Sequence, residues 1–110
     1  MIVKELIQAN GWEAINDNSG MNAVVEGAFV GDLLSFVMGN GEPGNAWITI
    51  QAHLNVIAVA MLREFSCIIF VSGANVTEDM IEKANEENIV LIKSDSSAYE
   101  SAIKLYKSLS

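Results

Sequence analysis

Three polar side chains, Gln51, His53 and Asn55, directly follow a segment, Ala46–Ile50, that is typical of a buried strand. An unbroken apolar run, Val56–Leu62, comes next and indicates a buried helix. Amide groups both donate and accept hydrogen bonds, so Gln51 and Asn55 suit an uncharged polar ligand such as the edge of a base or a ribose. The same amides would equally well form hydrogen bonds within this corner of the chain, and both interpretations stay open.

His53 is the only histidine, and it lies where the apolar helix would begin. A metal site generally needs three or four converging His, Cys or carboxylate ligands, and no such spacing occurs, so we expect no metal. General acid or base chemistry would need a group that orients the imidazole, for which Asp32 and Asp95 are the candidates. A histidine at a helix start more often caps the backbone than contacts a ligand. We therefore expect no catalytic residue, no cofactor and no enzyme.

Two further turns carry small polar residues directly after strand-like segments. Ser72 and Gly73 follow the apolar run Cys67–Val71, and Ser94 and Asp95 follow the next such run. Glycine lets backbone amides approach an anion closely, although the glycine and lysine spacing of a P-loop is absent and kinase chemistry is not expected. Ser94 and Asp95 would either line the same crevice or cap the helix that follows them.

Strands and helices alternate through the second half of the sequence. The expected strands are Ala46–Ile50, Ser66–Val71 and Ile89–Lys93, and the expected helices are Asn55–Phe65, Thr77–Glu87 and Ser97–Leu109. This alternation predicts an α/β fold, with a mainly parallel sheet and helices packed on both faces. In such sheets ligands bind at the carboxyl ends of the strands, where helix amino termini converge. The predicted ligand-binding rim is Gln51, His53, Asn55, Ser72, Gly73, Ser94 and Asp95.

The first half of the sequence predicts shorter elements. We expect a helix from Ile2 to near Gly11, a strand over Trp12–Ile15, a turn over Asp17–Asn22, a strand over Ala23–Glu26, a helix over Val30–Met38 and a loop over Gly39–Asn45. The carboxylate of Asp32 would favour the positive end of the helix dipole. A chain of this length suits one domain, residues 1–110, that buries its own core.

Several single residues have a structural interpretation. Thr77 is a suitable helix N-cap, and Ser97 with Glu100 three residues later forms a capping-box pattern. Thr49 alternates with apolar neighbours, so we expect it in the core with its hydroxyl bonded to the backbone. The helix after His53 is apolar nearly all round, which predicts burial on more than one side and leaves room for a subunit interface.

The charge balance restricts the partners of this chain. Fourteen acidic and six basic residues give a net charge of −8, which repels nucleic acid and anionic lipid surfaces. No apolar stretch approaches the roughly 20 residues that cross a bilayer, and the first ten residues lack the features of a signal peptide. We therefore expect no nucleic acid, no membrane and a cytoplasmic location. Cys67, the only cysteine, lies in an apolar run and should pack as a small hydrophobe.

Three segments resemble the DRTGG domain family: VGDLLSFVMGN from Val30, AWITIQAHLN from Ala46 and CIIFVSGANVTEDMIEKANEENIVLI from Cys67. The resemblance runs from Val24 to Tyr106 and includes order and spacing as well as residue types. The Asp-Arg-Thr-Gly-Gly motif itself is absent, and the glycine-bearing turn after the Cys67 strand reads Ser-Gly-Ala-Asn.

The resemblance implies a regulatory module. Domains of this family occur within some phosphotransacetylases, beside CBS domains in nucleotide-regulated pyrophosphatases and as stand-alone proteins, and they are similar to the N-terminal domain of HPr kinase/phosphorylase. The family implies an α/β fold that dimerises and has no catalysis of its own. For this chain we expect a homodimer that senses a small metabolite, in one version nucleotide-like, and that acts on a metabolic enzyme partner.

A protein-interaction or scaffold module without a small-molecule ligand is the alternative. Basic charge separates the two hypotheses, because anionic phosphates normally recruit Arg or Lys. Arg63 is the only arginine, and Lys93 is the only lysine near the predicted rim. Helix amino termini can nevertheless hold a single phosphate, so the sensor hypothesis is retained.

Overall fold

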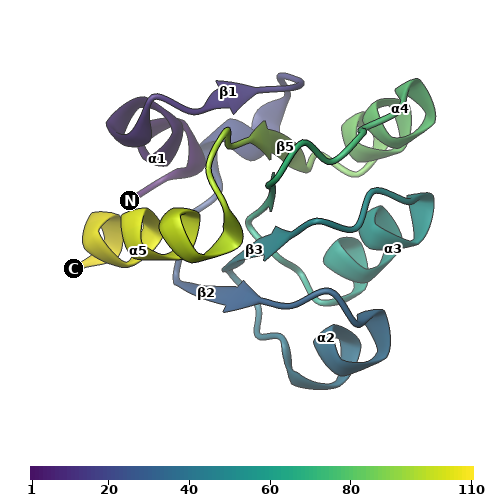
Figure 1. Ribbon diagram of the computed structural model, residues 1–110. Coiled ribbons are helices and arrows are strands. Elements are labelled where there is room, and N and C mark those ends of the chain that lie inside the picture. Colours follow the sequence, from purple (N-terminus) through teal and green to yellow (C-terminus); the bar gives the residue numbers. More distant parts are fainter.

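The computed structural model describes residues 1–110, which form one five-stranded sheet in the order β1-β5-β4-β3-β2 (Figure 1). The strands are β1 (Glu13–Ala14), β2 (Gly27–Val30), β3 (Asn45–Thr49), β4 (Cys67–Phe70) and β5 (Val90–Lys93). The strands from β2 to β5 run parallel, and β1 pairs antiparallel with β5. The predicted α/β fold with a mainly parallel sheet is therefore confirmed.

Five α-helices connect and cover these strands. They are α1 (Val3–Asn10), α2 (Leu34–Asn40), α3 (Leu54–Leu62), α4 (Glu78–Glu86) and α5 (Ala98–Leu109), and a 3₁₀ helix, η1, spans Ser19–Asn22. In the second half of the chain every predicted element is present, with ends that differ by a few residues at most.

Two elements predicted in the first half lie a few residues further along the chain than expected. The strand expected over Ala23–Glu26 is β2 at Gly27–Val30, and the helix expected from Val30 begins at Leu34. The earlier segment is extended, but it bonds to the start of the chain: the Val3 amide donates to the Ala23 carbonyl, and the Val25 amide donates to the Met1 carbonyl (both 2.9 Å). Sequence patterns identify an extended segment but do not show which neighbour it pairs with.

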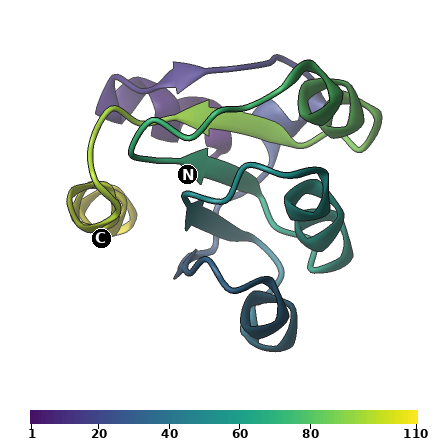
Figure 2. The same cartoon turned by 45° about the vertical axis from the view of Figure 1, so that its right-hand side comes forward.

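Two separate apolar clusters lie on the two faces of the sheet. α2, α3 and α4 cover one face, and α1 and α5 cover the other (Figure 2). Alternate strand residues supply the two clusters, as Trp47 and Ile48 of β3 illustrate. β3 and β4 are buried along their whole length, which explains why their sequences show no alternation of polar and apolar residues.

α3 is apolar nearly all round because α2 and α4 pack on either side of it while the sheet lies beneath. Its residues Val56, Ile57, Val59 and Ala60 are buried within the chain itself. Contacts within the chain thus account for most of the predicted burial of α3. Little apolar surface of this helix remains for a subunit interface.

Both predicted N-cap residues occupy N-cap positions, but only one of them forms the expected side-chain hydrogen bond. The Ser97 hydroxyl accepts from the Glu100 amide (3.1 Å) and donates to the Glu100 carboxylate (3.2 Å), so this cap is present. Thr77 occupies the N-cap position of α4, but its side chain makes no capping hydrogen bond, contrary to the prediction.

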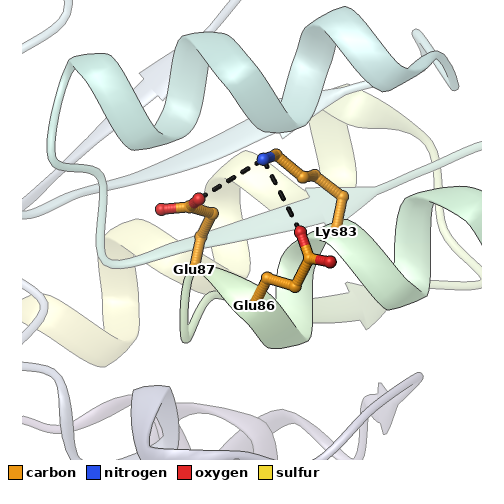
Figure 3. Close-up of polar contacts among 3 residues, drawn as sticks. All are labelled: Lys83, Glu86 and Glu87. Atoms are coloured by element: carbon orange, nitrogen blue, oxygen red, sulfur yellow. Dashed lines mark ion pairs between the residues drawn. The ribbon is translucent and has the colours of Figure 1, made fainter.

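The only ion pairs join residues of the last turn of α4 and its C-cap, where the Lys83 ammonium is 3.6 Å from the Glu86 carboxylate and 3.4 Å from that of Glu87 (Figure 3). Solvent-exposed pairs at this spacing contribute a few tenths of a kcal/mol at most. Stability therefore rests on the apolar clusters and on buried hydrogen bonds.

One buried amide joins the antiparallel edge to the parallel sheet. The Asn16 amide nitrogen donates to the Asn85 side-chain oxygen (2.8 Å) and to the Ile89 carbonyl (3.1 Å), and its oxygen accepts from the Leu91 amide (2.8 Å). Asn16 is buried, and so are its bonds to the Ile89 carbonyl and the Leu91 amide.

We expect Asn16→Ala to lower the free energy of unfolding by about 2–3 kcal/mol, because it leaves the Leu91 amide without its buried partner. Urea denaturation measures the change. Asn55→Ala, at an exposed amide whose side chain forms no hydrogen bond, is the control and should stay within about 0.5 kcal/mol of wild type. Equal losses in the two variants would contradict a role specific to Asn16.

Candidate functional site

The seven residues of the predicted rim follow β3, β4 and β5, which are adjacent and parallel. All seven therefore lie at the carboxyl ends of these strands. The topology divides them into two groups. Gln51, His53 and Asn55 lie in the β3–α3 corner, and the other four lie in the turns that follow β4 and β5.

In the β3–α3 corner the imidazole is used for capping. His53 is the N-cap of α3, and its Nδ1 accepts a hydrogen bond from the Asn55 amide at 3.0 Å. Gln51 donates through its backbone to the Thr49 hydroxyl (3.1 Å), and its side chain is exposed. No hydrogen bond or ion pair joins His53 to Asp32 or Asp95. The corner therefore contains no pair of groups arranged for acid–base chemistry.

Asp32 holds the carboxyl end of β3 in place. Its Oδ1 accepts from the Thr49 hydroxyl (2.8 Å) and from the Ile50 amide (2.9 Å). Thr49 is buried and its hydroxyl is bonded to the backbone, as predicted, since it accepts from the Gln51 amide; the donation to the Asp32 carboxylate was not predicted. Asp32 was expected to act on a helix dipole, so this bonding was missed. A hydroxyl within an apolar strand signals that a polar partner must exist, but the sequence did not show which one.

The connections that follow β4 and β5 leave the sheet on opposite faces. The chain passes from β4 to α4 on the face that also carries α2 and α3, whereas from β5 it passes to α5 on the other face. Divergence of this kind between neighbouring parallel strands marks the position, here called the crevice, at which open α/β sheets bind ligands. The two turns also contact each other, because the Ser72 amide donates to the Ser96 carbonyl at 3.4 Å. No such change of face occurs at β3, because α2, α3 and α4 all lie on one face.

Ser72 and Gly73 form the β4 side of this crevice. Both have left-handed backbone conformations, with φ of 55° and 74°, and both are exposed. A left-handed serine is uncommon and costs free energy, and such residues are concentrated at functional sites. No atom lies within 4 Å of the position that a Gly73 Cβ would occupy, so the turn leaves open space at the rim.

On the β5 side, Ser94 does not face the rim. Its side chain is 1% exposed, its hydroxyl lies 2.7 Å from the Ser101 hydroxyl, and it also accepts from the Ser96 amide at 3.3 Å. This buried contact fastens the end of β5 to α5. Asp95 next to it is exposed.

A surface pocket of about 230 Å³ adjoins the crevice. Its lining residues are Glu13, Ile15, Ala74, Asn75, Val76 and Lys93. None of these was among the seven predicted residues, because the pocket forms only where β1 pairs with β5 and brings Glu13 opposite Lys93. The exposed Lys93 supplies positive charge, and the volume is somewhat below the roughly 300 Å³ at which drug-sized ligand sites begin.

The other chemical groups of interest are metal-ligating side chains and the single thiol. No group of three or more His, Cys, Asp or Glu side chains is close enough to hold a metal ion. Burial raises the pKa of the Cys67 thiol to about 12, an effect that the hydrogen bond from Ser66 only partly offsets. The helices are also too short, or too polar, for any of them to cross a lipid bilayer.

No protein-family model matches this sequence, and no curated protein matches it either. Among solved structures, the chain is similar to the crystal structure of the CBS and DRTGG domains of the regulatory region of Clostridium perfringens pyrophosphatase, complexed with the activator diadenosine tetraphosphate. The TM-score is 0.71 at 16% identity, and the match covers 93% of this chain and 44% of that chain. This chain therefore spans less than half the length of its structural neighbour. The likeness concerns the fold, and it supports the DRTGG-like domain that the sequence segments predicted.

We expect His53→Ala to lower the free energy of unfolding by about 1 kcal/mol, because the Asn55 amide loses its side-chain acceptor. His53→Asn should recover most of this loss, since asparagine is among the best N-cap residues. Urea denaturation of the two variants tests this capping role. If both variants keep wild-type stability, the hydrogen bond from the Asn55 amide contributes nothing to the fold.

We expect the native Cys67 thiol to resist a disulfide exchange reagent at pH 8. A pKa of about 12 in place of 9.0 lowers the thiolate fraction about 1,000-fold, and the thiolate is the reactive form. The reaction rate, followed by absorbance, should rise steeply with pH in native protein and reach the rate of a free thiol in urea. Fast reaction of the native protein at pH 8 would contradict the burial of this group.

Proposed function

We propose that this chain is a non-catalytic regulatory module, which binds a small nucleotide-like metabolite at the crevice after β4 and β5, works as a homodimer and acts on a metabolic enzyme. The divergence of the chain after these two strands is the observation that carries the proposal. It sets an open left-handed turn, Ser72–Gly73, beside a pocket that contains Lys93. The fold neighbour is a regulatory region in complex with a dinucleotide activator, which supports the same chemistry here.

Chemically, the crevice offers what one phosphate and one polar ring would need. Gly73 allows close approach to the backbone, Lys93 offers one cation, and Asn75 offers an amide that both donates and accepts. Glu13 also lines the pocket, directly across from Lys93 on the paired strand, and a carboxylate there suits a ribose hydroxyl better than a second phosphate. The proposed ligand therefore carries little negative charge at this point. Gln51 and Asn55, both exposed at the neighbouring corner, would extend the rim.

The first experiment is a thermal-shift screen of the wild-type chain against a panel of nucleotides, dinucleotides and central metabolites. A ligand present at 100 times its dissociation constant stabilises the native state by about 2.7 kcal/mol, so we expect the melting temperature to rise by roughly 10 °C. Calorimetric titration then gives the dissociation constant for each compound that causes a shift.

Two pairs of variants locate the site. Lys93→Met should weaken binding about tenfold by removing the cation, whereas Lys4→Met, at an exposed position on α1, removes the same charge without effect. Gly73→Ala and Gly11→Ala impose similar backbone strain, since both glycines have positive φ and open space around the Cβ position. Only Gly73→Ala adds a methyl group at the crevice, so it alone should weaken binding. Unchanged affinity in both crevice variants would contradict this location.

The protein-interaction module remains the second candidate, and a specific observation favours it. Large apolar side chains are exposed at several places, among them Leu33, Phe36, Tyr99 and Tyr106. Contiguous exposed apolar surface indicates a macromolecular contact. A panel without any shift, from well-folded protein, would support this function in place of the sensor.

A further inference from the structure

The sheet has two edges, and they differ in how they are protected. β1 closes one edge with only two residues, which is too short to recruit another strand. β2 forms the other edge with the sequence Gly-Ala-Phe-Val and pairs only with β3. It carries no lysine, proline or bulge, the devices that usually prevent an edge strand from pairing with a further strand. The structure thus presents one unprotected strand edge.

Apolar side chains flank this edge on both sides of the sheet. On the α5 side, Tyr99, Ile103 and Tyr106 are spaced i, i+4, i+7 and form one exposed stripe. The opposite flank of α5 faces α1, because the Asn10 amide nitrogen donates to the Ser108 hydroxyl at 2.9 Å. The stripe therefore lies on the side of α5 away from α1, and α5 itself packs against β2. On the other side of the sheet, Leu33 and Phe36 are exposed at the start of α2.

The resulting surface, here called the edge patch, consists of Val30, Leu33, Phe36, Tyr99, Ile103 and Tyr106. Its two tyrosines are 76% and 75% exposed. A whole aromatic side chain presents roughly 200 Å², so the patch amounts to several hundred square ångströms, on the order of the ~800 Å² that each partner buries in a standard interface. Exposed apolar side chains gathered along one strand edge indicate a macromolecular contact.

We propose that the edge patch is the interface of a symmetric homodimer, in which β2 of one copy pairs antiparallel with β2 of the other. A strand edge needs another strand as its partner, and a twofold axis through β2 supplies one from the same surface. The six side chains of the patch are uncharged, although each chain carries −8 and the exposed Glu26 directly precedes β2. This inference deepens the homodimer part of the proposed function by assigning its surface.

Sedimentation equilibrium without any nucleotide tests the dimer separately from the ligand site. The wild-type chain should sediment at twice 11.9 kDa. Added salt should lower the dimer dissociation constant, because it screens repulsion between two acidic chains while apolar contacts and strand pairing persist. A monomer at every concentration and salt level overturns the proposal, and a ligand shift measured in the same preparation would leave the sensor function standing.

A matched pair of variants tests the surface. Val30 (52% exposed, at the β2 edge) and Leu62 (56% exposed, at the end of α3 on the opposite face) are similar in exposure. Val30→Lys should raise the dimer dissociation constant at least about tenfold, since a lysine on each edge strand opposes pairing, and Leu62→Lys should leave it unchanged. Equal effects of the two variants, in either direction, overturn the assigned surface. If Val30→Lys does not fold, Tyr106→Lys on the exposed stripe takes its place.

Spin labels give an independent readout of the strand pairing. The single native thiol is buried, so a label attaches only to an introduced cysteine. Ala28→Cys, in the middle of β2, should give a spectrum broadened by the label of the other copy, because paired strands lie about 5 Å apart. Leu62→Cys should give none. A dimer in which the Ala28→Cys label shows no broadening uses another surface and overturns the proposal.

Discussion

The full burial of β3 and β4 is the constraint on which the rest of the structure depends. Neither strand has a face that tolerates water, so helices must cover the sheet on both sides. Parallel strands in consecutive order need crossovers of one hand, which places α2, α3 and α4 together on one face. The other face is left for the two ends of the chain, and α1 and α5 cover it. The crevice after β4 and β5 is a consequence, since it forms where the chain changes face.

The same arrangement separates the two surfaces that the structure leaves open. The crevice lies at the carboxyl ends of β4 and β5, whereas the edge patch lies along β2 at one side of the sheet. α5 is the element common to both: it is fastened to the end of β5 by the Ser94 and Ser101 hydroxyls, and it packs against β2 further along.

Much of the fold could be predicted because the central strands and their helices have strong local signals. The apolar runs at Ala46–Ile50 and Ser66–Val71 have the length of strands, and the Ser97 cap defines the start of the last helix. The first half was harder to predict, since Ala23–Val25 is extended for a reason that lies elsewhere in the chain, namely its hydrogen bonds to Met1 and Val3. Pairing of this kind depends on distant residues, which no local pattern reports.

By itself, the sequence determined the α/β class, the order of the elements in its second half, the buried state of Cys67 and the edge of the sheet at which polar residues gather. Only the tertiary structure decided which of those residues face solvent. It used His53 as a helix cap, buried Ser94 against Ser101 and made Asp32 an acceptor for Thr49. It also brought Glu13 opposite Lys93, 80 positions later in the chain, to form a pocket. The physical reason is that strand pairing between distant segments, and the face on which each helix packs, depend on the whole core, whereas local residue patterns depend only on neighbours along the chain.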